Sequence, residues 1–145
     1  YDDIHIGLVV GLQGGMMVPV IRHADQQDIY TLAATMHQLQ TRTEAGELSS
    51  AELAGSTLTI SNLGMHGIDA FIAIINPPEA AILALGAIRS RPAVFNDQVV
   101  PRPLMNATLS ADHRVVDGIE AARFLGAFKQ LLENPHRLVV QTPGP

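Results

Sequence analysis

Alternating apolar and polar side chains predict strands near the start and in the middle of the chain. Residues 57–62 alternate in this way and are rich in β-branched side chains, which is typical of a strand with one buried face. Residues 4–10 and 16–21 are two further predicted strands, and Gly14-Gly15 between them predicts a hairpin. Pro19 favours an edge position or a bulge for the second strand, because proline has no backbone N–H to donate.

Helical periodicity first appears over residues 26–45. Apolar side chains fall at every third or fourth position there, which predicts one buried stripe along a helix. Asp25 or Asp28 can cap its N-terminus, and Gly46 can end it. Residues 49–52 resemble a capping box, which predicts a short helical turn. A second helix is predicted over 118–133, preceded by Asp117 as the N-cap and ended by Asn134-Pro135.

Four more apolar segments lie between these two helices. Residues 80–88 are apolar nearly throughout, so they form either a strand buried on both faces or a short buried helix. Gly86 and the hairpin predicted after it favour the strand. Asn96-Asp97 marks the turn of that hairpin, within residues 94–100. The other two segments are an apolar run at 71–75, ended by Asn76-Pro77-Pro78, and a strand at 104–110.

The order of these elements predicts the fold class. Strands, a helix, several strands and a second helix indicate an α+β fold, with a mixed or antiparallel sheet covered by helices on one side. The length of 145 residues suits one domain.

Composition excludes several classes of function. With 47% hydrophobic and 16% charged residues the chain is globular, and no apolar run approaches the length of a membrane span. The absence of cysteine excludes disulfides, thiolate metal sites and a cysteine nucleophile. A net charge of −5, with Lys129 as the single lysine, argues against nucleic acid. Five of the six histidines show no paired ligand spacing, so no metal site is expected: His5, His23, His37, His66 and His136.

The sixth histidine lies where chemistry is expected. His113 falls between a predicted strand and a predicted helix, in the segment Ser-Ala-Asp-His-Arg-Val-Val-Asp-Gly that spans residues 110–118. Histidine is the side chain best suited to remove a proton near neutral pH. Taken alone, a histidine before a helix is more often structural, and Asp117 is most simply an N-cap.

Several segments together resemble one enzyme family. His-x-x-x-Asp-Gly, formed by His113, Asp117 and Gly118, is similar to the active-site signature of dihydrolipoyl acyltransferases, the E2 components of 2-oxoacid dehydrogenase complexes, and of chloramphenicol acetyltransferases. The resemblance covers nearly all of residues 4–140 in the family's order. The other matching segments are 18–21 (Val-Pro-Val-Ile), 59–64 (Thr-Ile-Ser-Asn-Leu-Gly), 74–79 (Ile-Ile-Asn-Pro-Pro-Glu), 81–83 (Ala-Ile-Leu) and 122–125 (Ala-Arg-Phe-Leu).

The resemblance implies a chloramphenicol-acetyltransferase-like fold and a role for three residues. His113 would be the general base that removes a thiol proton from coenzyme A or dihydrolipoamide. Ser61 would donate a hydrogen bond to the oxyanion of the tetrahedral intermediate. Asp117 would support the site through an ion pair rather than transfer a proton.

The resemblance also implies a coenzyme channel. Ser61, Asn62 and Gly86 would lie along the coenzyme A site, and the lipoyl group would come from a domain outside this chain. Arg89, Arg91 and Arg102 surround the predicted hairpin. They could meet phosphates, although ordinary solvated surface is the favoured interpretation. Three positions depart from the family's pattern: Gly11, where an aspartate near the coenzyme site is common, Ile68 and Ala73.

Residues 1–145 are expected to be the C-terminal part of the acyltransferase catalytic domain. The start of that domain, the lipoyl domain and the peripheral-subunit-binding domain would precede them. The resemblance implies a homotrimer in which His113 of one subunit meets Ser61 of its neighbour. Trimers would assemble into a larger core, bind the E1 and E3 components through the absent domains, and receive the lipoyl domain.

The acyl group and two alternative functions stay open at this point. Ser61-Asn62-Leu63-Gly64 differs from the corresponding segment of the succinyl-transferring branch, and residues 84–88 and 110–113 resemble the branched-chain branch more than the pyruvate branch. The alternatives are an acetyltransferase of the chloramphenicol acetyltransferase type, which acts on a small hydroxylated acceptor, and a structural core subunit without turnover. The family resemblance implies the cytoplasm of a bacterium or the mitochondrial matrix of a eukaryote.

Overall fold

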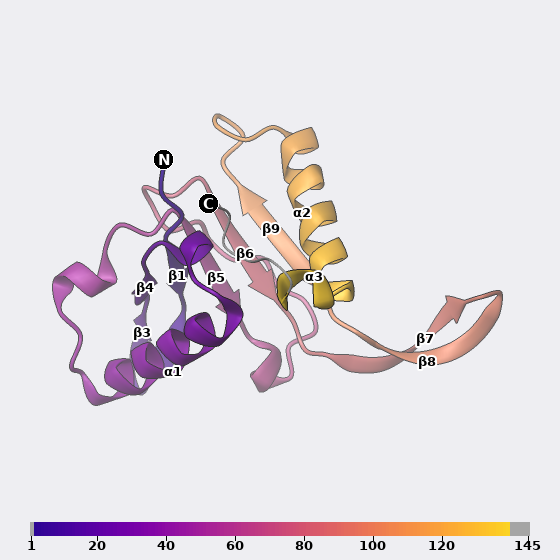
Figure 1. The fold of residues 1–145 in the computed structure, drawn as a ribbon, viewed down its shortest axis with the longest axis horizontal. Coiled ribbons are helices and arrows are strands. Elements are labelled where there is room, and N and C mark those ends of the chain that lie inside the picture. Colours follow the sequence, from indigo (N-terminus) through magenta and orange to yellow (C-terminus); the bar gives the residue numbers. More distant parts are fainter. Residues whose placement is uncertain (1, 140–145) are drawn as a thin grey trace.

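A mixed five-stranded sheet organises the protein, for which a computed structural model describes residues 2–139 (Figure 1). The strand order is β4-β1-β5-β6-β9; β1, β5 and β6 are parallel, and β4 and β9 are antiparallel edges. The sheet strands are β1 (Ile6–Leu8), β4 (Val20–Ile21), β5 (Leu58–Asn62), β6 (Ala81–Leu85) and β9 (Ala107–Ala111). Two separate ladders join β2 (Val10–Leu12) to β3 (Gly15–Met17), and β7 (Arg89–Phe95) to β8 (Gln98–Leu104).

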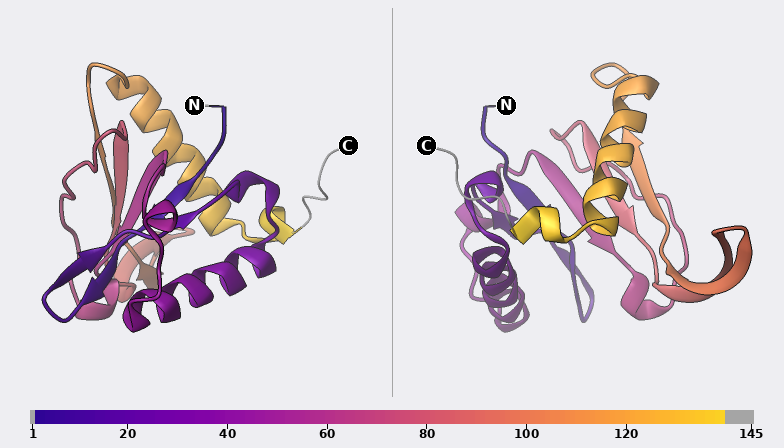
Figure 2. Two further views of the ribbon diagram at one scale, coloured as in Figure 1. Left: turned by 90° about the vertical axis from the view of Figure 1, so that its left-hand side faces the viewer. Right: turned by 45° about the vertical axis from the view of Figure 1, so that its right-hand side comes forward.

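The helices cover one face of this sheet. Residues 2–139 contain α1 (Ile29–Ala45), α2 (Gly118–Glu133) and α3 (His136–Val139), and three short 3₁₀ turns: Ala24–Gln26, Ser50–Leu53 and Gly64–His66. Figure 2 shows α1 and α2 on the same side of the sheet, with the segment between β5 and β6 on the other side. This confirms the expected α+β fold with a mixed sheet and helices packed on one side.

The expected caps set the helix ends. Asp28, not Asp25, caps α1, because its Oδ1 accepts hydrogen bonds from the backbone N–H groups of Tyr30 and Thr31 at 2.9 and 2.8 Å. Gly46 ends α1 at a φ of 72°, a conformation that glycine adopts without strain. Ser49 and Glu52 form the expected capping box. Within residues 2–139 no helix is long and apolar enough to cross a bilayer.

The segment 68–79 covers the opposite face of the sheet with alternate side chains. Phe71, Ala73 and Ile75 pack against Ile82 and Ala84 of β6, while Ile72 and Ile74 point outward and are 82% and 91% exposed. The segment makes no ladder in the described structure, so the apolar run at 71–75 is an extended cover rather than a strand of the sheet.

The other strand predictions need smaller corrections. The strand expected over residues 80–88 is the buried strand β6, with Leu83 only 1% exposed. The strand expected over 104–110 is divided: β8 ends at Leu104 and β9 begins at Ala107, because residues 98–104 pair with β7 whereas residues 107–111 pair with β6. The hairpin of residues 4–21 is likewise split into two ladders.

The hairpin of β7 and β8 projects from the body of the molecule (Figure 1). Asn96 and Asp97 occupy its turn with φ values of 49° and 59°, the left-handed conformation of a tight two-residue hairpin turn. Val94 and Val99, paired across the ladder, are 75% and 73% exposed. An isolated two-stranded ribbon of this kind has little stability of its own.

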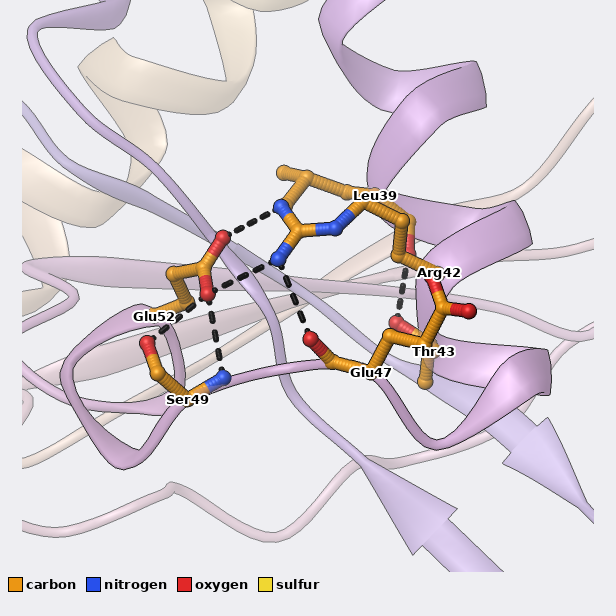
Figure 3. Close-up of polar contacts among 6 residues, drawn as sticks. All are labelled: Leu39, Arg42, Thr43, Glu47, Ser49 and Glu52. Atoms are coloured by element: carbon orange, nitrogen blue, oxygen red, sulfur yellow. Dashed lines mark hydrogen bonds and ion pairs between the residues drawn. The ribbon is translucent and has the colours of Figure 1, made fainter.

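One ion pair joins α1 to the turn that follows it. Figure 3 shows Arg42 reaching Glu52 through both carboxylate oxygens, at 2.5 and 3.1 Å, while Glu52 also accepts from Ser49. The hydrogen bond from Arg42, with smaller contributions from Ser49, lowers the pKa of Glu52 from 4.5 to about 2.

We expect this pair to make stability fall in acid. Because the folded pKa of Glu52 is depressed, its contribution is full above about pH 4.5 and is lost as the pH falls toward 2. Glu52→Gln should therefore lower the urea midpoint at pH 7 and weaken its decline between pH 4.5 and 2. Glu44→Gln, on exposed α1 surface, is the control. Equal acid dependence in the parent and Glu52→Gln would contradict the prediction.

Candidate functional site

His113 lies in the tight turn between β9 and α2 and is exposed. The preceding residue, Asp112, donates its backbone N–H to the Ala80 carbonyl at 2.8 Å, which ties the turn to the start of β6. The Asp112 carbonyl accepts from Val115 and Val116 at 2.9 and 3.0 Å. The imidazole of His113 is therefore presented to solvent from a turn whose backbone is held at both ends.

The two neighbours of His113 form an ion pair with each other. Arg114 donates from Nε to Asp112 Oδ1 at 2.9 Å and from a terminal guanidinium nitrogen to Oδ2 at 2.6 Å. Its backbone N–H also reaches Asp112 Oδ1, at 3.0 Å. The hydrogen bond from Arg114 lowers the pKa of Asp112 to about 2. The sequence motif assigns no role to Asp112 or Arg114, although they are the immediate neighbours of His113.

A surface hollow of about 470 Å³ opens beside this turn. Ile75 and the turn at residues 77–80 form one wall, and Asp112, Arg114 and Val115 form the other. The hollow is large enough for part of a small-molecule substrate, and it is lined by both chain neighbours of His113, Asp112 and Arg114, but not by His113 itself.

Asp117 caps α2, as its sequence position predicts. Its Oδ1 accepts from the backbone N–H groups of Ile119 and Glu120, each at 2.8 Å, and Glu120 Oε2 accepts from the Asp117 N–H at 3.4 Å. The carboxylate therefore stabilises the start of the helix. Within residues 2–139 no ion pair is found for Asp117, so the expected ion pair with an arginine stays a prediction.

Ser61 lies near the opposite end of the sheet from His113. It is 7% exposed and pairs with Ala84 near the C-terminal end of parallel β5 and β6, whereas Ala111, at the end of β9, pairs with Ala81. At about 3.3 Å per residue, these levels are about 10 Å apart along the strands, and the chain runs further away to reach His113. One chain does not bring Ser61 and His113 together.

Asn62 and Gly86, the other two residues expected at the coenzyme site, lie near Ser61. Asn62 is exposed, and its Oδ1 accepts from the Gly64 N–H at 2.8 Å, which closes the turn after β5. Gly86 is buried, and a Cβ there would lie 2.0 Å from the carbonyl oxygen of Asp69. The close approach of segment 68–70 thus requires a glycine at 86 without any ligand.

The arginines around the β7–β8 hairpin are occupied by the protein itself. Asp69 accepts from Arg89 at 2.7 Å and from Arg91 at 2.5 Å, and Arg89 holds its pKa below the usual range. Arg102 lies over the ring of Phe95, 4.5 Å from its centroid. These contacts support the interpretation of the three arginines as ordinary surface.

Two polar clusters were not foreseen from the sequence. His5, His23 and Asp3 gather with their potential ligand atoms within 4.8 Å of one another, although no paired spacing linked the histidines. His5 Nδ1 already accepts the His23 backbone N–H at 3.0 Å, so this nitrogen is used within the protein. The second cluster surrounds Glu79, a carboxyl only 5% exposed that accepts from Ser56, Thr59 and Asn76.

Comparison with known proteins identifies a family. The model of the 2-oxoacid dehydrogenases acyltransferase (catalytic domain) matches residues 1–140. The chain is 43% identical, over 98% of its length, to the dihydrolipoyllysine-residue acetyltransferase component of the pyruvate dehydrogenase complex of Rickettsia bellii. It is 40% identical, over 97%, to the lipoamide acyltransferase component of the branched-chain alpha-keto acid dehydrogenase complex of Pseudomonas aeruginosa. The chain spans 34% and 33% of these two relatives.

Solved structures agree with this match. The dihydrolipoamide acetyltransferase of Azotobacter vinelandii superposes with a TM-score of 0.90 at 36% identity, over 97% of this chain and 58% of that chain. The cubic core of a pyruvate dehydrogenase multienzyme complex also superposes with a TM-score of 0.90, at 35% identity and the same coverage. A serine, a histidine and an asparagine were investigated for their role in catalysis by the Azotobacter enzyme. The serine precedes that histidine by 52 positions, and the asparagine follows it by four.

Proposed function

The chain belongs to the 2-oxoacid dehydrogenases acyltransferase (catalytic domain) family, and we propose that it transfers an acyl group between the thiol of dihydrolipoamide and coenzyme A. One observation carries the assignment of residues. Ser61 precedes His113 by 52 positions and Asp117 follows it by four, the same spacing as the serine, histidine and asparagine investigated for their role in the catalytic mechanism of the Azotobacter acetyltransferase. Aspartate replaces that enzyme's asparagine here.

The proposed reaction needs a base and an oxyanion donor. The Nε2 or Nδ1 of His113 removes the proton from the thiol of coenzyme A, and the resulting thiolate attacks the carbonyl carbon of the acyl-dihydrolipoamide thioester. Ser61 Oγ–H donates to the oxygen that becomes negative in the tetrahedral intermediate. The intermediate collapses by breaking the bond to the dihydrolipoamide sulfur, which takes the proton back from His113. Asp117 supports this arrangement by fixing the start of α2.

The separation of Ser61 from His113 within one chain supports a site shared between two subunits. We infer a homotrimer in which His113 of one subunit faces Ser61 of its neighbour. Exposed aliphatic side chains supply the surface that such neighbours would cover. They include Ile72, Ile74, Ile88, Val94, Val99 and Val115, each more than 65% exposed.

We also propose that the trimers assemble into a larger core, since the chain is similar to a cubic core along 97% of its length. The lipoyl domain and the E1 and E3 components would be its partners within a 2-oxoacid dehydrogenase complex. A site in the bacterial cytoplasm or the mitochondrial matrix follows from the same proposal.

The acyl group is the least determined part of the proposal. Relatives from pyruvate, acetoin and branched-chain systems have 43%, 39% and 40% identity, so these values do not favour the branched-chain group. The branched-chain preference therefore stays a prediction from residues 84–88 and 110–113.

An acyl-transfer assay tests the proposal and this preference together. Acetyl-CoA and isobutyryl-CoA are offered with dihydrolipoamide to this chain and to an N-terminally extended chain, and acyl-dihydrolipoamide is measured. We expect transfer by the extended chain, with the faster donor identifying the branch. Absence of transfer from both donors would contradict the catalytic proposal and favour a structural core subunit. Transfer to a small hydroxylated acceptor but not to dihydrolipoamide would favour the chloramphenicol acetyltransferase type.

Ser61→Ala should lower kcat by about 10²–10³-fold, the usual effect of removing one oxyanion donor. KM for both substrates should change little, because the hydroxyl acts on charge that develops only in the transition state. Steady-state kinetics of the active assembly measure both constants. Ser90→Ala, on the exposed surface of β7, is the control. A raised KM for coenzyme A with unchanged kcat would instead make Ser61 a binding residue.

A further inference from the structure

We propose that the ion pair between Asp112 and Arg114 is a positioning device for His113, which holds the histidine turn in the orientation that proton transfer requires. The inference rests on the proposed function, because it adds two residues to that reaction. It starts from the position of the pair, on the two residues that flank the proposed base.

Asp112 fixes the turn from the sheet side. Its side chain is 25% exposed, and its backbone bonds to Ala80, Val115 and Val116 leave it little freedom. Each carboxylate oxygen also accepts from Arg114: Oδ1 from the backbone N–H and Nε, and Oδ2 from Nε and a terminal nitrogen. A two-pronged pair of this kind constrains direction as well as distance.

His113 is the residue left between these two locked neighbours. The guanidinium folds back onto Asp112, so both flanking side chains are used within the turn while the imidazole stays exposed. With its pKa at about 2, Asp112 remains ionised at every pH at which histidine can act as a base.

The pair is poorly explained by stability alone. The Arg114 side chain is 89% exposed, and ion pairs at such sites contribute little to the free energy of unfolding. Its geometric effect is larger, because a displacement of a catalytic group by about 1 Å can cost about 10²-fold in rate. Arg114 could instead contact the phosphates of coenzyme A directly. The test must therefore distinguish coenzyme binding by Arg114 from positioning of His113.

The test is a set of variants of the assembled acyltransferase, assayed for kcat and for KM of both substrates. We expect Asp112→Ala and Arg114→Ala each to lower kcat by about tenfold or more, with KM unchanged. The double variant should be no slower than either single variant, because either substitution alone already removes the ion pair. In the His113→Ala background, Asp112→Ala should have no further effect, since it acts only through the histidine.

Controls separate this role from a loss of structure. Lys129→Ala and Glu133→Ala break an exposed pair on α2, at 3.9 Å, and should leave kcat unchanged. If Asp112→Ala fails to assemble, Asp112→Asn keeps an oxygen for the Arg114 N–H but loses the ionic contact, and should still lower kcat.

Three results would overturn the proposal. These are an unchanged kcat in Arg114→Ala and in every Asp112 variant that assembles, losses that multiply in the double variant, and a raised KM for coenzyme A in Arg114→Ala alone. The parent and His113→Ala, measured beside them, report on the function itself. If the parent shows no transfer that depends on His113, the proposed function fails, whereas an active parent with indifferent Asp112 variants removes only this inference.

Discussion

Replacing His113 with alanine should lower kcat for acyl transfer by about 10²–10⁴-fold, the range that a general base contributes. Without the imidazole, the coenzyme A thiol must lose its proton to water, and a thiol with a pKa of about 8.5, as in cysteine, or higher is at most a few per cent thiolate near neutral pH. Substrate binding should persist, because the proposed role of His113 is to hold a proton.

The pH dependence separates this role from a structural one. Since the thiolate fraction rises with pH, the His113→Ala variant should recover rate steadily up to about pH 9, while the parent stays well above it at neutral pH. Steady-state kinetics from pH 6 to 9 measure both profiles. His136→Ala, at the exposed start of α3, is the matched control and should behave as the parent. An unchanged rate in His113→Ala would contradict the assignment of His113 as the general base and support a structural core subunit.

Local sequence rules predicted the helices well, because their ends are set by nearby residues. The segment 118–133 matches α2 at both ends, and Asp28 and Gly46 bound α1. The strand expected over 104–110 failed for the opposite reason. Its break marks the point where the chain stops pairing with β7 and begins to pair with β6. No local pattern records those distant partners.

The candidate site also has parts that local sequence predicts and parts that it does not. His113 and Asp117 are four residues apart, so a motif can identify them together. The placement of Ser61 at the far end of the sheet follows from the pairing of β5, β6 and β9, which residue types alone do not give. The Asp112–Arg114 pair was missed although its residues adjoin the histidine, because a motif records identities and not which side chains bond to each other.

The Gly86→Ala change should have the largest effect on stability, since it places a methyl group where backbone already lies. The new Cβ would sit 2.0 Å from the Asp69 carbonyl oxygen and 2.7 Å from its carbon, so segment 68–70 must move by more than 1 Å. Such movement is opposed by the bond from the Ala87 N–H to the Ile68 carbonyl, at 2.8 Å. We expect a loss of about 3 kcal/mol or more, at the upper end for overpacked cores.

Urea unfolding without coenzyme A measures this loss directly, because a glycine needed only for ligand access would leave the midpoint unchanged. Gly126→Ala is a control that should raise the urea midpoint instead of lowering it. It lies inside α2, where no atom beyond its chain neighbours and the surrounding helix backbone comes within 4 Å of the added methyl group. Glycine-to-alanine changes in exposed helix interiors stabilise by about 1 kcal/mol. If Gly86→Ala has the parent's urea midpoint but a raised KM for coenzyme A, Gly86 would be a residue of the coenzyme A site, as the family resemblance implies. A lowered midpoint would show that the glycine is needed for the close approach of segment 68–70 to the end of β6. This part of the sheet lies beside Asn62 and Ser61, the proposed oxyanion donor.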